Sequence, residues 1–323
     1  MRTEQRYLII FPIVLVVIGL MLCEDVSGVA GLVWHYVHKR MVVPLHDLVW
    51  YVLFTPACLS AIALTFALER FIPANPRQKI VGPGLSQDFV WFFYERIFHL
   101  LVFITYVDWL KRVYAEHWDF LTIQAIGTWP APVRFVLGVL LLDLLYWVQH
   151  YLNHKVPWLW RFHVLHHSQR ELNFFTDYRY HVVEYLVRHT IIAIPFLFLD
   201  FETPTVVAFA YFQRWYTRFY HGNIKTSLGW FKYILVTPQS HRIHHSIEPQ
   251  HHDKNYGALF SIWDFAFGTQ YRHFDQYPDT GVAGERFPYE NTTRFPMLLF
   301  APAIQTLHSI SSLRGRLDRS KTP

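Results

Sequence analysis

The sequence predicts an all-α integral membrane protein: a bundle of about four membrane-spanning helices and a re-entrant hairpin, capped by a histidine-rich region that faces the cytosol. Three observations predict this fold. Of the 323 residues, 52% are hydrophobic and 16% are charged, whereas a soluble domain usually carries about 25% charged residues. The apolar residues form long runs. The chain also holds 20 histidines, most of them in one part of the sequence.

The same composition excludes several other classes of protein. Intrinsic disorder, coiled coil and collagen do not fit so apolar a chain. Two cysteines cannot build a dense disulfide framework or a four-thiolate metal cluster. The net charge of +5 is better explained by basic loops at an anionic membrane face than by nucleic-acid binding, so no nucleic-acid partner is expected.

The first apolar run, Leu8 to Cys23, is close to the lower length limit of a spanning helix. Because Arg2 and Arg6 flank it, a cleaved signal peptide is the alternative. The other three predicted spans are Leu48–Leu68, Phe89–Val107 and Val133–Tyr151. Glu95 and Arg96 interrupt the third of these and are expected near the membrane interface.

A fifth apolar region, Leu186 to Phe212, is broken at Asp200–Pro204. Each half holds about 13 residues, too few to cross a bilayer, which predicts a hairpin that enters the membrane and returns to the same face. The Lys and Arg residues of the loops place the N-terminus inside, so four spans return the chain to the cytosol after His154. No repeat or linker is visible, and residues 1–323 are expected to form a single membrane domain.

Thirteen of the 20 histidines lie between His150 and His252. Histidines at helical i, i+3 and i+4 positions share one face and can present two nitrogens to one metal ion. Neutral imidazole suits iron, zinc, copper and nickel, and eight such ligands exceed what one ion accepts, so two metal ions are predicted. Three clusters have this spacing: His150 with His154, then His163, His166 and His167, then His241, His244 and His245.

Three further residues are candidates for the same site. His181 precedes the predicted hairpin and His221 follows it, so both return to the face that carries the clusters, as further ligands or as hydrogen-bond partners of ligands. Asp143 lies inside the fourth predicted span, on one helical stripe with His150 and His154. A carboxylate inside a membrane is a candidate functional residue, and a structural partner for Arg or Tyr is the alternative. The remaining histidines lack ligand spacing and are expected to be ordinary packed side chains.

The three clusters, with Pro157–Trp160 before the second, resemble the histidine motifs of the fatty acid hydroxylase/sterol desaturase superfamily of membrane di-iron enzymes. The resemblance is closest to bacterial sterol-desaturase-like members and alkylglycerol monooxygenases. It extends to a tail formed by Asp253–Gly257, Trp263-Asp264 and Phe267–Thr269. The region that resembles the superfamily covers residues 130–272 and is the expected catalytic region.

The resemblance implies an oxidoreductase with two iron ions, O2 as co-substrate and a lipid or sterol substrate, in the bacterial inner membrane or the endoplasmic reticulum. The expected reaction is hydroxylation of an unactivated C–H bond, and desaturation at the same kind of site is the alternative. An external ferredoxin or b-type cytochrome is expected to supply electrons. Gly82-Pro-Gly84 lacks the third glycine of a dinucleotide-binding motif, and Cys23 and Cys58 cannot hold an iron–sulfur cluster.

Other metal chemistries fit the sequence less well. A ferritin-like carboxylate site needs paired Glu-x-x-His motifs, and the one such spacing, Glu248 to His251, stands alone and contains proline. Transmembrane haem would need facing histidines within the spans, whereas these cluster at one end. The H-E-x-x-H motif of zinc hydrolases is absent from the sequence. A metal-dependent membrane hydrolase is kept as the alternative from another class.

Overall fold

The computed structural model describes residues 56–199, 203–282 and 300 of the chain. Within this part the regular elements are helices, and strand-like pairing is limited to three isolated bridges, which confirms the predicted all-α fold. The first predicted span, Leu8–Cys23, and the beginning of the second lie outside the described residues.

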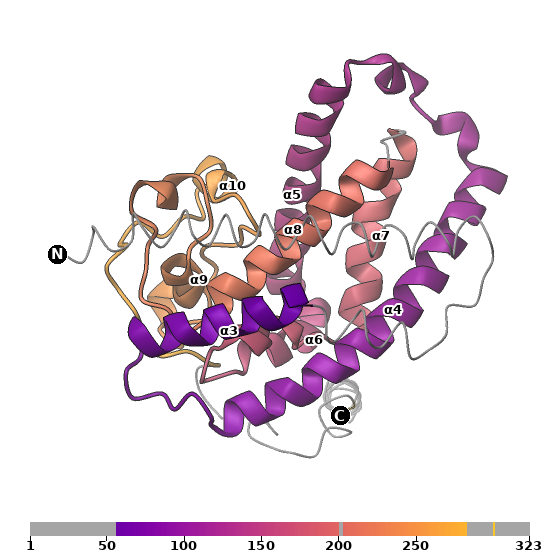
Figure 1. The fold of residues 1–323 in the computed structure, drawn as a ribbon. Coiled ribbons are helices and arrows are strands. Elements are labelled where there is room, and N and C mark those ends of the chain that lie inside the picture. The colour runs from indigo at the N-terminus through magenta and orange to yellow at the C-terminus, as the bar shows by residue number, and fades with distance from the viewer. Residues whose placement is uncertain (1–55, 200–202, 283–299, 301–323) are drawn as a thin grey trace, which may run out of the picture.

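The described residues form five helices of 16 to 35 residues and several shorter ones (Figure 1). The α-helices are α3 (Pro56–Phe71), α4 (Pro83–His117), α5 (Ala131–Lys155), α6 (Pro157–His167), α7 (Val182–Phe198), α8 (Thr203–His221), α9 (Pro238–His244) and α10 (Ile262–Ala266). The 3-10 helices are η1 (Asp119–Leu121), η2 (Gln124–Thr128), η3 (Phe174–Tyr178), η4 (Gly229–Tyr233) and η5 (Pro249–His251). Helix α7 contacts both α4 and α5, while the short helices α6, α9 and α10 gather toward one end of the long ones (Figure 1).

Of the helices in the described ranges, α5 alone has the length and apolar composition needed to cross a membrane. It contains the fourth predicted span and begins just after Pro130, as the proline-rich turn predicts. The described part of the second predicted span lies in α3, of 16 residues, and the third lies in α4, of 35 residues. Of the four predicted spans, one, in α5, is therefore supported by a helix of suitable length and composition. Glu95, which the sequence placed near a membrane interface, is buried and bonded to Arg214 of α8 at 2.6 Å.

The predicted break in the fifth apolar region is present. Helix α7 ends at Phe198 and α8 begins at Thr203, and the two halves hold 17 and 19 residues. Both helices pack on α5, so the polar side chains that they carry face the same part of the interior as the end of α5. Whether this hairpin enters the membrane and returns stays a prediction.

Two aromatic cores and one buried ion pair fix the segments around the histidines. Trp91 and Phe92 of α4 pack with Phe175 of η3, and this cluster holds α4 against the connection between α6 and α7. Asp88 of α4 is buried beneath it and pairs with Arg179. A second cluster, which includes residues of α3 and α8, packs against the segment that follows α9.

Candidate metal centre

The first two histidine clusters come together because a single residue separates the helices that carry them. Val156 is both the C-cap of α5 and the N-cap of α6, in an extended conformation. Pro157 then starts α6 at a position where the missing N–H costs no helical hydrogen bond. The chain therefore turns sharply, and the ring centres of His154 and His163 lie 5.0 Å apart.

The third cluster lies on α9, a helix of seven residues whose start is fixed by local hydrogen bonds. Thr237 caps it by accepting a bond from the backbone N–H of Ser240, and the Ser240 side chain accepts from the N–H of Thr237. Pro238 occupies the first turn. This short, well-capped helix holds His241 and His244 in a fixed orientation toward α5 and α8.

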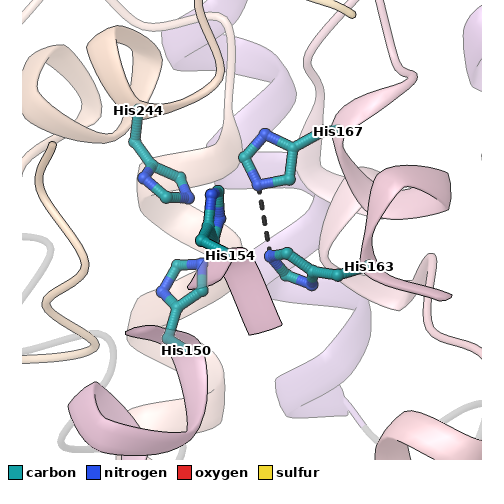
Figure 2. A group of neighbouring side chains, drawn as sticks. All are labelled: His150, His154, His163, His167 and His244. Atoms are coloured by element: carbon teal, nitrogen blue, oxygen red, sulfur yellow. Dashed lines mark hydrogen bonds between the residues drawn. The ribbon is translucent and has the colours of Figure 1, made fainter. Parts of the chain in front are cut away.

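The histidines form two groups, and within each group one nitrogen from every ring lies within 4.8 Å of the others. The first group is His150, His154, His163, His167 and His244 (Figure 2). The second group is His166, His221, His241 and His245. All eight clustered histidines that the sequence singled out are present in these groups, together with His221. The second cluster is divided between the groups, because His163 and His167 face one way and His166 the other.

His181 lies outside both groups. It caps α7, with its Nδ1 accepting a bond from the backbone N–H of Val183 at 3.1 Å, and its ring packs on Phe162. His251 also lies outside them, buried and bonded to Ser246, as expected for a packed histidine.

Asp143 is fully buried and accepts four hydrogen bonds. Two come from the backbone N–H groups of Leu259 and Phe260, and two from the side chains of Trp263 and Gln213, at 2.6–3.0 Å. Through these bonds the Asp143 carboxylate holds the segment before α10 against α5. The catalytic role suggested from the sequence stays a prediction.

In four histidines of the two groups, a hydrogen bond at Nδ1 fixes the ring proton on that nitrogen. Two of these bonds go to backbone carbonyls in the loop after α9: Nδ1 of His150 donates to Tyr256 at 2.9 Å, and Nδ1 of His244 donates to Lys254 at 2.7 Å. With the proton on Nδ1, Nε2 carries the free lone pair. Nε2 of both rings is buried and has no hydrogen-bond partner.

The other two bonds act in the same way on different helices. Nδ1 of His163 donates to the Glu184 carboxylate at 2.8 Å, and Nδ1 of His221 donates to the carbonyl of Thr217 at 2.6 Å. Glu184 also accepts a bond from Asn153 at 2.8 Å. A carboxylate or carbonyl behind the ring fixes its orientation and raises the basicity of the nitrogen that faces a metal ion.

In the second group the Nε2 atoms converge. Nε2 of His221 lies 2.8 Å from that of His241 and 3.2 Å from that of His166, and Nε2 of His245 lies 3.0 Å from that of His241. In the first group Nε2 of His163 lies 3.2 Å from Nε2 of His167 (Figure 2). Two nitrogens bound to one ion at about 2.0–2.1 Å lie about 2.8–3.4 Å apart in tetrahedral or octahedral geometry. The spacing of these nitrogen pairs is therefore that of ligands to a single ion.

Burial favours the neutral form of four of these rings. It lowers the pKa of His167, His241 and His245 well below the ordinary value, an effect that the neighbouring histidines reinforce, and it lowers the pKa of His244 to about 3. Neutral imidazoles with converging lone pairs repel one another unless a cation or a proton lies between them. The donor set therefore fits a transition-metal ion in each group.

A cavity lies beside both groups and is lined by histidines from each of them, among them His150, His163, His221 and His241. Most of its other lining residues are polar and come from α5, α7 and α8; they include Gln149, Arg188 and Gln213. These three are not among the site residues predicted from the sequence. The rule that flagged Asp143, a charge inside an apolar run, would also have flagged Arg188.

This fold and site define a helical protein that buries two groups of neutral histidines able to hold transition-metal ions. The fatty acid hydroxylase family matches residues 135–269. The resemblance to that superfamily expected from the histidine clusters is confirmed for this part of the chain.

Curated relatives include an alkylglycerol monooxygenase of Caenorhabditis elegans, which is 26% identical over 222 residues, 68% of this chain and 40% of that protein. An ornithine lipid hydroxylase of Rhizobium tropici is 31% identical over 141 residues, 44% of this chain and 43% of that protein. A cholesterol 25-hydroxylase-like protein of Danio rerio is 27% identical over 164 residues, 49% of this chain and 64% of that protein. The chain thus matches less than two thirds of the length of each. No solved structure matches it.

Proposed function

We propose that the protein is a membrane oxidoreductase that hydroxylates a C–H bond of a lipid with O2, using two iron ions. The observation that carries the proposal is the pair of converging histidine groups, with Nε2–Nε2 separations of 2.8–3.2 Å. The matching family and the relatives named as hydroxylases and monooxygenases support oxidation of a lipid. The same names favour an alcohol over an alkene as the product.

His150, His154, His163, His167 and His244 would hold one ion, and the second group would hold the other. When bound, the two ions supply the redox chemistry that activates O2 for attack on a C–H bond. The protein's own residues hold the rings in place: Glu184 and the carbonyl oxygens of Lys254 and Tyr256 keep the protons on Nδ1, so that Nε2 stays available.

The overall reaction converts a C–H bond, O2, two electrons and two protons into a C–OH group and water. We assign the electrons to an external one-electron donor protein, a ferredoxin or a b-type cytochrome with its reductase. Donors of this kind are acidic in many cases and would dock on a basic cytosolic face. We further propose that both histidine groups face the cytosol, in the bacterial inner membrane or the endoplasmic reticulum.

The test is metal content and activity in single variants. His166→Ala removes a ligand of the second group and His244→Ala a ligand of the first, and each should lower the iron content and abolish lipid hydroxylation. His251→Ala is the matched control, because His251 is equally buried but belongs to neither group. Iron measured by mass spectrometry at wild-type levels, with full activity in both ligand variants, would refute the proposal. Zinc in the purified wild type would not, since zinc binds such sites more tightly than ferrous iron.

A further inference from the structure

Polar side chains line part of the cavity beside the two histidine groups, and we call this part the polar wall. Gln149 of α5, Arg188 of α7 and Gln213 of α8 form part of this wall. Because histidines of both groups line the same cavity, a molecule that contacts the polar wall also lies against the proposed metal centre.

Arg188 is buried, yet its contacts with acceptors are long. Its Nε lies 3.4 Å from the Gln149 side-chain oxygen, and its Nη2 lies 3.9 Å from Glu184, whose oxygen is already bonded to His163 at 2.8 Å. A charge-assisted hydrogen bond is usually about 2.7–2.9 Å long. The guanidinium also stacks over the ring of Tyr180 at 4.2 Å, and the rings of Tyr146 and Tyr185 lie within 6 Å.

Arg214 lines the same cavity but is already satisfied, because it bonds Glu95 at 2.6 Å. The contrast identifies Arg188 as the cation that is able to take an oxygen acceptor from a ligand.

The two glutamines add one donor and one acceptor. The Gln149 oxygen faces Arg188, which leaves its Nε2 buried without a partner. The Gln213 nitrogen donates to Asp143 at 2.6 Å, which leaves its Oε1 buried without a partner. Buried polar groups of this kind are expected to be paired, either by water or by a ligand.

We propose that this polar wall binds the oxygen-bearing head group of a polar lipid. Arg188 and Gln149 Nε2 would hold a carbonyl or anionic oxygen, and Gln213 Oε1 would accept a bond from a hydroxyl or N–H of the same head group. The proposal rests on the proposed function and extends it: the oxidised carbon lies within a few bonds of the head group. A sterol side chain or the far end of an acyl chain would leave the cation and both amides unpaired, and buried polar sites reject such ligands strongly.

Binding can be measured without turnover, on the full chain in detergent and without reductant, by native mass spectrometry. Four probes separate the chemistry: monopalmitoylglycerol (acceptor and donor), palmitate (acceptor alone), hexadecane and cholesterol. We expect the wild type to bind monopalmitoylglycerol at least about tenfold more tightly than hexadecane or cholesterol. Arg188→Met should abolish the difference, and Arg188→Lys should keep part of it, because Lys keeps the charge but not the planar fork.

Gln149→Met should weaken monopalmitoylglycerol binding without changing hexadecane binding. The matched control is Gln270→Met, because Gln270 is also buried with one unpartnered amide atom but does not line the cavity. Wild-type metal content and melting temperature in each variant would show that its fold is intact. Equal binding of all four probes, or binding that does not depend on Arg188, would overturn the inference.

The products separate this inference from the proposed function. With iron, O2 and a ferredoxin–reductase pair, tandem mass spectrometry locates the new oxygen on monopalmitoylglycerol. Oxygen near the head group supports the inference, and oxygen at the methyl end overturns it. Arg188-dependent binding with no oxidation of any probe would contradict the proposed function while leaving the head-group site intact.

Discussion

Tyr256 and His150 are linked by a hydrogen bond of 2.9 Å from the ring Nδ1 to the backbone carbonyl, although 106 residues separate them. Two positions earlier, the carbonyl of Lys254 accepts the corresponding bond from His244 at 2.7 Å. One loop therefore fixes the tautomers of two rings that come from different helices. Both rings belong to the first histidine group.

The loop can present both carbonyls because its backbone is unusual. Asp253 and Asn255 have positive φ angles of 60° and 58°, a left-handed conformation that Asp and Asn adopt more readily than most residues. Asn255 is also anchored at both ends of its side chain, to the carbonyl of Ser240 and the N–H of Tyr271 at 2.8 Å each.

We predict that Asp264→Asn removes the ion of the first group and leaves that of the second. Asp264 accepts bonds from the N–H groups of Tyr256 and Gly257 at 2.8 and 2.7 Å and from the Trp147 side chain at 3.0 Å. Asn would turn an NH2 group toward one of these donors and shift the carbonyl of Tyr256. Loss of a group that orients a ligand typically costs about 10–100-fold in metal affinity. Mass spectrometry should find one ion per chain.

Combined variants identify which ion is lost. Adding His244→Ala to Asp264→Asn should cause no further loss, whereas adding His241→Ala should remove the remaining ion. Two ions per chain in Asp264→Asn at limiting metal would contradict this role.

Asp143→Asn should lower stability but retain both ions. One of the two Asp143 oxygens accepts hydrogen bonds from Leu259 and Gln213, and the other accepts from Phe260 and Trp263. Replacing one oxygen with a donor leaves buried N–H groups unpaired, at a cost of about 1–3 kcal/mol. A thermal melt and a metal assay test this prediction. A fully loaded, equally stable variant with at least about a hundredfold lower turnover would instead support the catalytic role suggested by the sequence.

The metal-free protein should lose stability as the pH falls below about 6.5, the ordinary histidine value. The pKa of His244 is lowered to about 3 and that of His245 well below the ordinary value, both chiefly by burial. The unfolded chain therefore takes up protons below pH 6.5 that the folded chain does not. Each such ring contributes a loss of up to about 1.4 kcal/mol per pH unit until its folded pKa is reached.

Melting of chelator-treated protein at pH 7.5 and pH 5.5 measures this effect. The metal-loaded protein should be much less sensitive over the same range, because bound ions exclude protons. An identical pH dependence with and without metal would show that the histidine groups are not the cause.

Positions 155, 225 and 250 should all be labelled from the cytosolic side of the membrane. Lys155, Lys225 and Gln250 are exposed. Lys155 is the last residue of α5, Lys225 follows α8, and Gln250 lies in η5. Single cysteines at these positions, in a chain lacking Cys23 and Cys58, can be probed with an impermeant reagent. Labelling of any two from opposite sides would contradict a common cytosolic face.

The sequence predicted well which histidines lie together, but not how they are distributed between the two groups. Helical spacing predicted that His163, His166 and His167 share one face; the structure agrees for His163 and His167 but places His166 in the other group. The same spacing cannot show that His166 turns toward α8 and α9, because that depends on how α6 packs. His221 lies 20 residues before His241, so no local spacing links it to the second group, and His181, ranked equally with it, lies outside both groups.

The positions of the helices were likewise more predictable than the contacts between them. Apolar run length predicted α5 and the break between α7 and α8. It did not reveal that Glu95 is neutralised inside the protein by Arg214, since that ion pair joins residues 119 positions apart. Hydropathy describes each segment alone, while such pairs depend on tertiary structure.

The division of α6 between the two groups also limits how this part of the chain can change in length. His166 and His167 are adjacent, yet each faces a different group of rings. The rotation of α6 about its axis must therefore suit both groups at once. One residue added between Trp160 and His163 would turn the following residues by about 100° and carry them about 1.5 Å along the axis. Insertions and deletions in α6 should therefore be far rarer among functional homologues than substitutions on its outer surface.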